Sequence, residues 1–226
     1  MLEQYCELRK VRNMLDYGFY NMDCMEGTRQ FPDNYFDLAI VDPPYGIERF
    51  KKASGTTRFK SSKLMQEKGL TWDTKPTEEY WKELFRVSKN QIIWGANNFV
   101  LPPTEYFCIW NKQQTVDNFA SAEYAWVSMG LKMPAKVFDY SIHKHNHTNK
   151  VHPTQKPIPL YTYLLSIYAT KGNKILDTHV GSASSLIACH KSGFDYVGFE
   201  LDKEYFDMAS KRLNEEKAQS NLFDLD

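Results

Sequence analysis

The sequence lacks several features that would place the protein in a broad class at once. Its 226 residues contain 28 Lys and Arg against 28 Asp and Glu, so net charge predicts no general attraction to nucleic acid. Any basic surface must therefore be local. No apolar run approaches membrane-spanning length, and the N-terminal residues lack the apolar segment of a signal peptide. We expect a cytoplasmic protein without a membrane partner.

Cysteine is scarce and scattered, since the four cysteines form no C-x-x-C pair. This spacing argues against a cysteine zinc site and against a disulfide framework, and it favours a reducing compartment. Alternating histidines at 143, 145 and 147 could instead bind a metal. No acid lies close to them in sequence to support such ligands, so we predict no metal site.

Strand-like and helical segments alternate along the chain. The predicted strands are 19–22, 37–41, 91–94, 107–110, 122–127, 174–177 and 196–200, and the predicted helices are 80–87, 158–169, 184–192 and 205–213. This alternation predicts an α/β fold, with a mostly parallel sheet and helices on both faces. The length fits a single domain, residues 1–226, with a small insertion.

Asp42-Pro43-Pro44-Tyr45 is the most informative motif, and it directly follows the apolar run 38–41. That run predicts a buried parallel strand. Each proline fixes its own φ and holds the preceding residue extended, so the motif forms a rigid corner. The corner fixes a carboxylate, backbone carbonyls and an aromatic ring relative to one another. Such a set suits a planar base with an exocyclic amine, although an ordinary turn at a strand end would read the same.

A small-residue turn, Asp177 to Ser185, joins a predicted strand to a predicted helix. Gly181 allows close approach of the backbone to a ligand, and the helix N-terminus offers free N–H groups. The turn lacks the Gly-Lys-Ser/Thr of a phosphate loop. Glu200 ends the next strand, about 20 residues on, where an acid can accept hydrogen bonds from ribose hydroxyls. The pattern predicts a nucleotide-cofactor turn.

These motifs together resemble the β (permuted) class of bacterial and phage DNA amino-methyltransferases, which use S-adenosylmethionine. The motifs occur in the order of that class: Asp23-Cys24, Asp42 to Tyr45, His152-Pro153-Thr154-Gln155-Lys156-Pro157, and the Asp177 turn with Glu200. Trp94 to Phe99 is also similar to a segment common in these enzymes. The resemblance covers nearly the whole chain and implies a Rossmann-like methyltransferase fold in permuted order, with the catalytic half first.

The resemblance also implies a role for each motif. The catalytic set would be Asp42, Pro43, Pro44 and Tyr45, with the target base beside Asp42 and stacked on Tyr45. The cofactor would contact Asp23, Cys24, Thr154, Lys156, Asp177, Gly181, Ser182 and Glu200. Within that set, Asp23 would lie by the adenine, Glu200 would hold the ribose, and Lys156 would neutralise the amino-acid carboxylate.

The cofactor turn departs from the family pattern Asp-Pro-Phe-x-Gly-Ser-Gly-Thr. Thr178, His179, Ala183 and Ser184 replace the proline, phenylalanine, second glycine and threonine. We expect the turn itself to survive because Gly181 and Ser182 remain. We also expect Ala183 to narrow the backbone approach and His179 to change a packing surface, which would lower cofactor affinity.

Two basic stretches fall outside the strand–helix alternation. Residues 49–63 contain six Lys or Arg and no acid, and they could close over DNA phosphates or form a solvated loop. Residues 111–150 correspond to the target-recognition insertion of the family and are short, which predicts a short recognition site or a homodimer on double-stranded DNA. Within them, Lys144, His145 and Asn146 are candidate DNA contacts.

Adenine N6 is the favoured target because an aspartate leads the Pro-Pro-Tyr motif; in the family, serine more often leads for cytosine N4. A non-catalytic DNA-binding or cofactor-sensing derivative remains an alternative. The sequence leaves open the recognition site and any restriction endonuclease partner.

Overall fold

The computed structural model describes residues 14–46, 74–146, 152 and 154–223. An eight-stranded sheet runs through this part of the chain in the order β1-β8-β7-β2-β3-β5-β4-β6. Its strands are β1 (Gly18–Asn21), β2 (Leu38–Val41), β3 (Gln91–Trp94), β4 (Phe107–Asn111), β5 (Ala122–Val127), β6 (Lys136–Asp139), β7 (Lys174–Asp177) and β8 (Asp195–Glu200).

The first five strands in spatial order, from β1 to β3, are all parallel. The direction changes at β5, which lies antiparallel to both β3 and β4, while β6 runs parallel to β4 at the sheet edge. The carboxyl ends of the parallel strands therefore meet at one edge of the sheet. Ligands of open α/β sheets bind at that edge.

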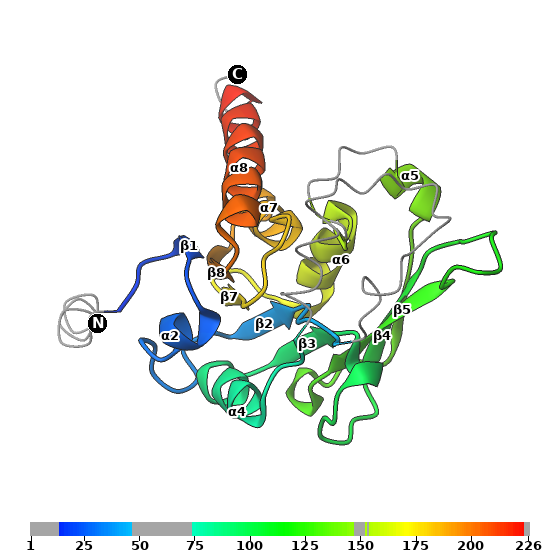
Figure 1. The fold of residues 1–226 in the computed structure, drawn as a ribbon, viewed down its shortest axis with the longest axis horizontal. Coiled ribbons are helices and arrows are strands. Elements are labelled where there is room, and N and C mark those ends of the chain that lie inside the picture. Colours follow the sequence, from blue (N-terminus) through cyan, green and yellow to red (C-terminus); the bar gives the residue numbers. More distant parts are fainter. Residues whose placement is uncertain (1–13, 47–73, 147–151, 153, 224–226) are drawn as a thin grey trace.

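Helices cover both faces of the sheet (Figure 1). The longer helices are α4 (Glu78–Val87), α6 (Ile158–Tyr168), α7 (Ser184–Lys191) and α8 (Lys203–Phe223), and the short ones are α2 (Cys24–Thr28), α5 (Ile142–Asn146), η1 (Ala96–Asn98) and η2 (Met129–Leu131). Buried side chains of α6, α7 and α8 pack in one hydrophobic cluster. Those of α4 pack in a second cluster, on the opposite face.

The central strands are apolar because both of their faces are covered. Every residue of β2 is at most 1% exposed, and β3 is buried throughout. Side chains of β2 alternate between the two clusters, with Leu38 and Ile40 on one side and Ala39 and Val41 on the other. The buried strand therefore anchors the start of the Asp42 motif rigidly.

The predicted fold class is confirmed, since the sheet is mostly parallel, has helices on both faces and has the Rossmann-like arrangement. Strand β6, helices α2 and α5, and the short helices η1 and η2 were not predicted from the sequence. Strand β6 escaped detection because its residues are half exposed and begin with a lysine. The basic stretch 49–63 lies outside the described residues.

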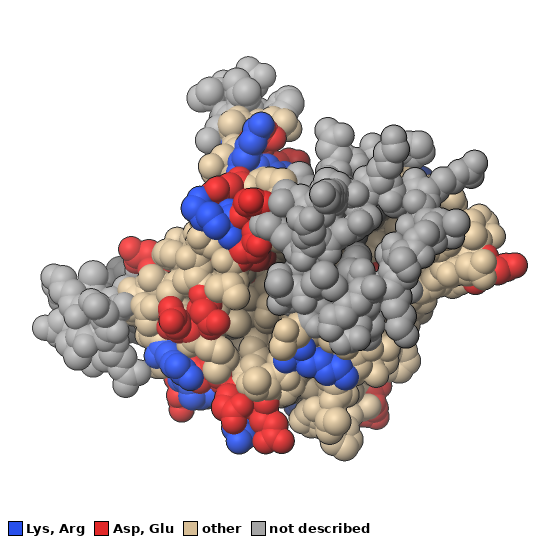
Figure 2. Space-filling model, viewed as in Figure 1, with Lys and Arg blue, Asp and Glu red and all other residues tan. Residues whose placement is uncertain are grey.

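Acidic and basic side chains lie interspersed over the described part of the face in Figure 2. This agrees with the balanced composition. Within the described ranges, no helix combines the length and apolar character needed to cross a membrane.

Candidate active site

A cleft of about 700 Å³ opens at the carboxyl edge of the parallel strands. Its lining residues come from segments 22–24, 42–44, 74, 152–161, 178–184 and 199–205. Most of these segments lie at the ends of β1, β2, β7 and β8 or at the start of α6, so neighbouring strands bring them to one place. The volume lies within the range of about 300–1,000 Å³ that is usual for small-molecule sites.

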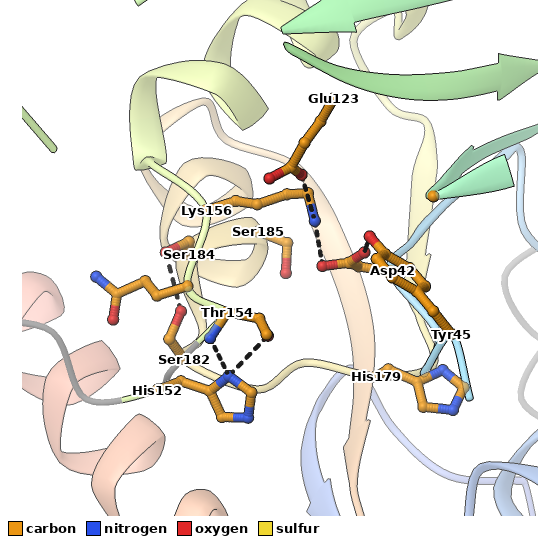
Figure 3. A network of polar contacts seen from close by, with 12 residues as sticks. Asp42, Tyr45, Glu123, His152, Thr154, Lys156, His179, Ser182, Ser184 and Ser185 are labelled. Carbon is orange, nitrogen blue, oxygen red and sulfur yellow. Dashed lines mark hydrogen bonds and ion pairs between the residues drawn. The ribbon is translucent and has the colours of Figure 1, made fainter. Parts of the chain in front are cut away.

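Asp42 stands directly after β2, and both of its carboxylate oxygens have partners (Figure 3). The hydroxyl of Tyr45 donates to Oδ1 at 2.6 Å, and the ammonium of Lys156 contacts Oδ2. Burial and the neighbouring carboxylate raise the pKa of Tyr45 well above its usual value, so its hydroxyl remains a donor. The carboxylate is thus oriented from two sides before any ligand arrives.

Lys156 also contacts a second carboxylate, that of Glu123 on β5. Its Nζ lies 3.2 Å from Glu123 Oε2, and Lys112 lies 2.6 Å from Glu123 Oε1. Burial opposes ionisation of Glu123, but the two ammonium groups outweigh it and lower its pKa to about 2. Burial likewise opposes the charge of Lys156, yet Asp42 and Glu123 raise its pKa well above the usual value.

The glycine turn, residues 177–185, is tied to the end of β8. The N–H of Gly181 donates to Glu200 Oε2 at 2.9 Å, and the N–H of Asp202 donates to Glu200 Oε1 at 3.0 Å. Gly181 has φ +55°, which favours glycine, and the ring of His152 lies 3.7 Å from the position of a Cβ there. The turn therefore presents backbone and the Glu200 carboxylate to the cleft.

Asp177 lies behind this turn and does not line the cleft. Its carboxylate accepts hydrogen bonds from the His179 N–H at 3.0 Å and from the Ser185 hydroxyl. Burial raises the pKa of Asp177 to about 7, although these two donors oppose the rise. The structure therefore does not place Asp177 against the cofactor as expected, but beneath the turn, which its hydrogen bonds hold in shape.

Thr178 and His179, two of the residues that depart from the family pattern, form a small network with Tyr80. The Tyr80 and Thr178 hydroxyls are 2.7 Å apart, and Thr178 Oγ1 lies 2.9 Å from His179 Nδ1. The Tyr80 ring meets the His179 ring edge-on at 5.4 Å. Burial lowers the pKa of His179 to about 4, so the imidazole is neutral at pH 7. His179 thus replaces an aromatic packing surface with a neutral polar ring.

Ala183 adopts a left-handed backbone conformation at the start of α7, with φ +62°. Its side chain is fully buried and is absent from the cleft wall. We expected Ala183 to narrow the space in which the backbone approaches the ligand. Because Ala183 does not line the cleft, this expectation is wrong. The cost of alanine here falls on backbone strain, because left-handed geometry disfavours a Cβ.

Asp23 and Cys24 lie at the other end of the cleft, after β1. Asp23 caps α2, since its Oδ1 accepts a hydrogen bond from the Met25 N–H at 2.6 Å. Burial, together with the charge of Asp23, raises the pKa of Cys24 to about 12, so its thiol is protonated at neutral pH. Met22 and Phe199 add apolar surface beside them.

The sequence that forms this cleft is similar to that of known DNA methylases. The model of the N6/N4 DNA methylase family matches residues 110–211. The type II methyltransferase M.HinfI of Haemophilus influenzae is 24% identical over 90% of this chain and 70% of its own length. These matches support membership of the chain in the DNA N6/N4 methylase family.

Solved structures agree on the fold of this methylase. The M1.HpyAVI–SAM complex aligns at a TM-score of 0.56 with 20% identity, covering 86% of this chain and 98% of that one. The cytosine-N4-specific PvuII DNA methyltransferase aligns at a TM-score of 0.57 with 12% identity, covering 90% and 92%.

Most of the site residues expected for a methylase come together in the cleft. The lining includes Asp23, Cys24, Asp42, Pro44, Thr154, Lys156, Gly181, Ser182 and Glu200. Pro43 is buried beneath the corner, and Tyr45 reaches the site through Asp42. The individual roles of these residues stay predictions. The contacts of Lys156 with Asp42 and Glu123 give it partners that the family motif did not predict.

Three residues of the site were missed in the sequence. Glu123 and Lys112 are single charges near strand ends, and nothing in their spacing links them to Lys156. The presence of an acid inside an otherwise apolar strand was the available signal for Glu123. His152 belongs to a recognised motif, but its packing on Gly181 and on the Tyr205 ring, at 4.4 Å, depends on the fold.

The alternating histidines do not act as one exposed group. His145 is 2% exposed and its Nε2 lies 2.6 Å from the carbonyl oxygen of Gln155, so it is wrong as a DNA contact. Lys144 and Asn146 are exposed on α5, while His147 lies outside the described residues. Among the residues that are described, no three His, Cys, Asp or Glu side chains are grouped to hold a metal.

Proposed function

We propose that this DNA methyltransferase transfers a methyl group from S-adenosylmethionine to the N6 amine of a flipped-out adenine. The observation that carries the proposal is the position of Asp42, which lines the same cleft as the Gly181 turn and Glu200. A carboxylate that binds an amine thus faces the site for a methyl donor.

The residues of the cleft fit S-adenosylmethionine by their chemistry. Each oxygen of Glu200 accepts one backbone hydrogen bond and keeps another lone pair for a ribose hydroxyl. Met22, Cys24 and Phe199 offer apolar surface to an adenine ring. Thr154 also lines the cleft, beside His152, and offers a polar partner to the amino-acid end. When bound, the cofactor supplies an electrophilic methyl group on a sulfonium.

Asp42 acts on the acceptor amine, whose lone pair is delocalised into the ring of the base. A carboxylate has about four acceptor sites, and Tyr45 and Lys156 occupy one on each oxygen. A remaining site on Asp42 accepts one amine hydrogen, and the Pro43 carbonyl accepts the other. This favours a pyramidal nitrogen aimed at the methyl group, and positioning then supplies much of the acceleration. Asp42 can also take up the proton that the methylated nitrogen loses.

The target base must leave the duplex before Asp42 can reach its amine. Flipping costs a few kcal/mol, and stacking on an aromatic ring returns about 1–3 kcal/mol. The Tyr45 ring lies against Gly95, so a base would stack on a part of the ring that Gly95 leaves open. The hydrogen bond to Asp42 holds this ring in place.

Incubation with methyl-labelled S-adenosylmethionine and mixed-sequence DNA, followed by nucleoside analysis, tests the proposal. We expect label in N6-methyladenine. Label in N4-methylcytosine would instead identify the cytosine activity, which the PvuII enzyme of similar fold carries in its name. Cofactor and DNA binding without any transfer would identify a non-catalytic derivative.

A further inference from the structure

Four side chains of alternating charge form successive ion pairs that end at the catalytic carboxylate: Lys112, Glu123, Lys156 and Asp42. Lys112 lies 2.6 Å from one oxygen of Glu123, and Lys156 lies 3.2 Å from the other. Lys156 then contacts Asp42, which accepts the Tyr45 hydroxyl (Figure 3). We call these four residues the ion-pair row.

The ion-pair row joins parts of the chain that are distant in sequence. Lys112 and Glu123 stand where the β4–β5 hairpin meets its connecting loop, and the N–H of Lys112 donates to the Ser121 carbonyl there at 2.9 Å. This loop and β5 belong to the expected recognition insertion, residues 111–150. Lys156 precedes α6, and Asp42 follows β2. The catalytic carboxylate is therefore connected directly to the base of that insertion.

Burial raises the free-energy cost of losing a contact in the ion-pair row. The side chain of Lys156 is 4% exposed and that of Asp42 is 16% exposed, whereas Glu123 is 27% exposed. A buried ammonium needs ionised partners, and leaving one uncompensated is strongly destabilising. Lys156 has two such partners, and its Nζ also lies 5.5 Å from the centre of the Trp94 ring. The two carboxylates and the ring together define a single position for the ammonium.

We propose that Glu123 is a positioning residue for methyl transfer, holding the Lys156 ammonium so that Lys156 orients the Asp42 carboxylate. This inference rests on the proposed function. Lysine has a long flexible side chain, and Asp42 alone would leave its ammonium free to follow the carboxylate. Glu123, itself fixed by Lys112, anchors the ammonium from the side away from Asp42. The lone pairs of Asp42 then keep one direction when the target amine arrives.

The Glu123→Gln variant tests the proposal because it keeps the shape of the side chain and removes its charge. We expect single-turnover methyl transfer to slow by about 10- to 100-fold, as small misplacements of a reacting group do. Glu123 does not line the cleft and acts on it only through Lys156, so the Kd for S-adenosylmethionine is expected to rise by less than the transfer rate falls. Glu83→Gln is the matched control, because Glu83 forms a 2.7 Å ion pair with Arg86 on α4, away from the cleft.

The double variant Lys112→Met/Glu123→Gln separates positioning from simple charge balance. Glu123→Gln leaves one surplus positive charge in the ion-pair row, and the double variant removes that surplus. If Glu123 positions Lys156, the double variant regains thermal stability but stays slow. Recovery of the wild-type rate in the double variant would mean that charge balance alone matters, and would overturn the proposal.

The remaining outcomes are also decisive. Wild-type turnover in Glu123→Gln, or loss of cofactor binding in both variants, would overturn the positioning role. Failure of the wild-type protein to methylate any DNA would instead refute the proposed function. The two failures are therefore distinguishable within one set of measurements.

Discussion

Tyr45 and Gly95 fit each other so closely that a Cβ on Gly95 would lie 2.1 Å from the Tyr45 ring. Gly95 follows β3, has φ +65° and precedes η1. The Tyr45 ring therefore lies directly on the backbone of the neighbouring strand end. Its hydroxyl reaches Asp42 from that position.

Gly95→Ala is expected to displace the Tyr45 ring and to slow methyl transfer by at least about 10-fold, through lost positioning of Asp42. The variant also pays about 1–2 kcal/mol of left-handed backbone strain. Gly193→Ala is the matched control, since Gly193 has φ +71° and nothing lies within 4 Å of its added Cβ. Equal rates in the two variants would show that Tyr45 has no role.

Asp42→Ala is expected to abolish methyl transfer while S-adenosylmethionine still binds. The change removes the acceptor of the amine hydrogens but leaves the Gly181 turn and its bond to Glu200 intact. Transfer assays and equilibrium binding of the cofactor check the two halves of this prediction. Turnover like that of the wild type would rule out the catalytic role of Asp42.

His179→Phe, which restores the usual family residue, is expected to make stability less sensitive to acid. Burial lowers the pKa of His179 to about 4, whereas the unfolded chain has a histidine pKa near 6.5. Between these values the unfolded state binds a proton that the folded state does not, so stability falls as pH falls from about 6.5 to 4.

Urea unfolding at pH 7 and at pH 5 measures this difference between His179→Phe and wild type. The contribution of one histidine is at most about 1.4 kcal/mol per pH unit. His152, whose pKa is also lowered by burial to about 4, is unchanged in both proteins and serves as the common background. Identical pH dependence in the two proteins would contradict the prediction.

Ala183→Gly is expected to be tolerated far better than Ala188→Gly. Both alanines are fully buried and either change loses the same methyl group. Ala183 has φ +62°, so glycine relieves about 1–2 kcal/mol of strain there. Ala188 lies inside α7, where glycine costs about 1 kcal/mol. We expect a gap of about 2 kcal/mol in the free energy of unfolding, and equal losses would show that Ala183 is unstrained.

Much of the fold was predictable because its central strands are short apolar runs bounded by turn residues. The predicted strands 91–94, 122–127 and 174–177 match β3, β5 and β7 residue for residue. Strand β6 and helix α5 were not predictable in this way, since half-exposed residues carry little hydrophobic pattern. The antiparallel direction of β5 likewise depends on tertiary pairing, which no local pattern encodes.

The candidate site was predictable where a motif is local and unpredictable where contacts cross the sheet. Asp42 and Gly181 each stand in a run of residues whose backbone geometry can be argued from proline or glycine. Glu123 has no such run, and its link to Lys156 exists only because β5 lies beside β3. Asp177 was predicted to contact the cofactor, but it does not line the cleft, and its position behind the turn follows from its bonds to Ser185 and His179.

The order of strands in the sheet also governs how the protein is made. Leu38 pairs with Ile175, and Asn21 pairs with Glu200. Strand β1 and one edge of β2 therefore cannot pair until the last strands of the chain have been synthesised. At about 5–20 residues per second of synthesis, β2 waits roughly 10–30 s for its partner β7. During that time an apolar strand has an unpaired edge, which is a hazard for aggregation. The ribosome thus delivers Asp42 first and the Gly181 turn last, so the nascent chain cannot complete the cleft until synthesis is nearly finished.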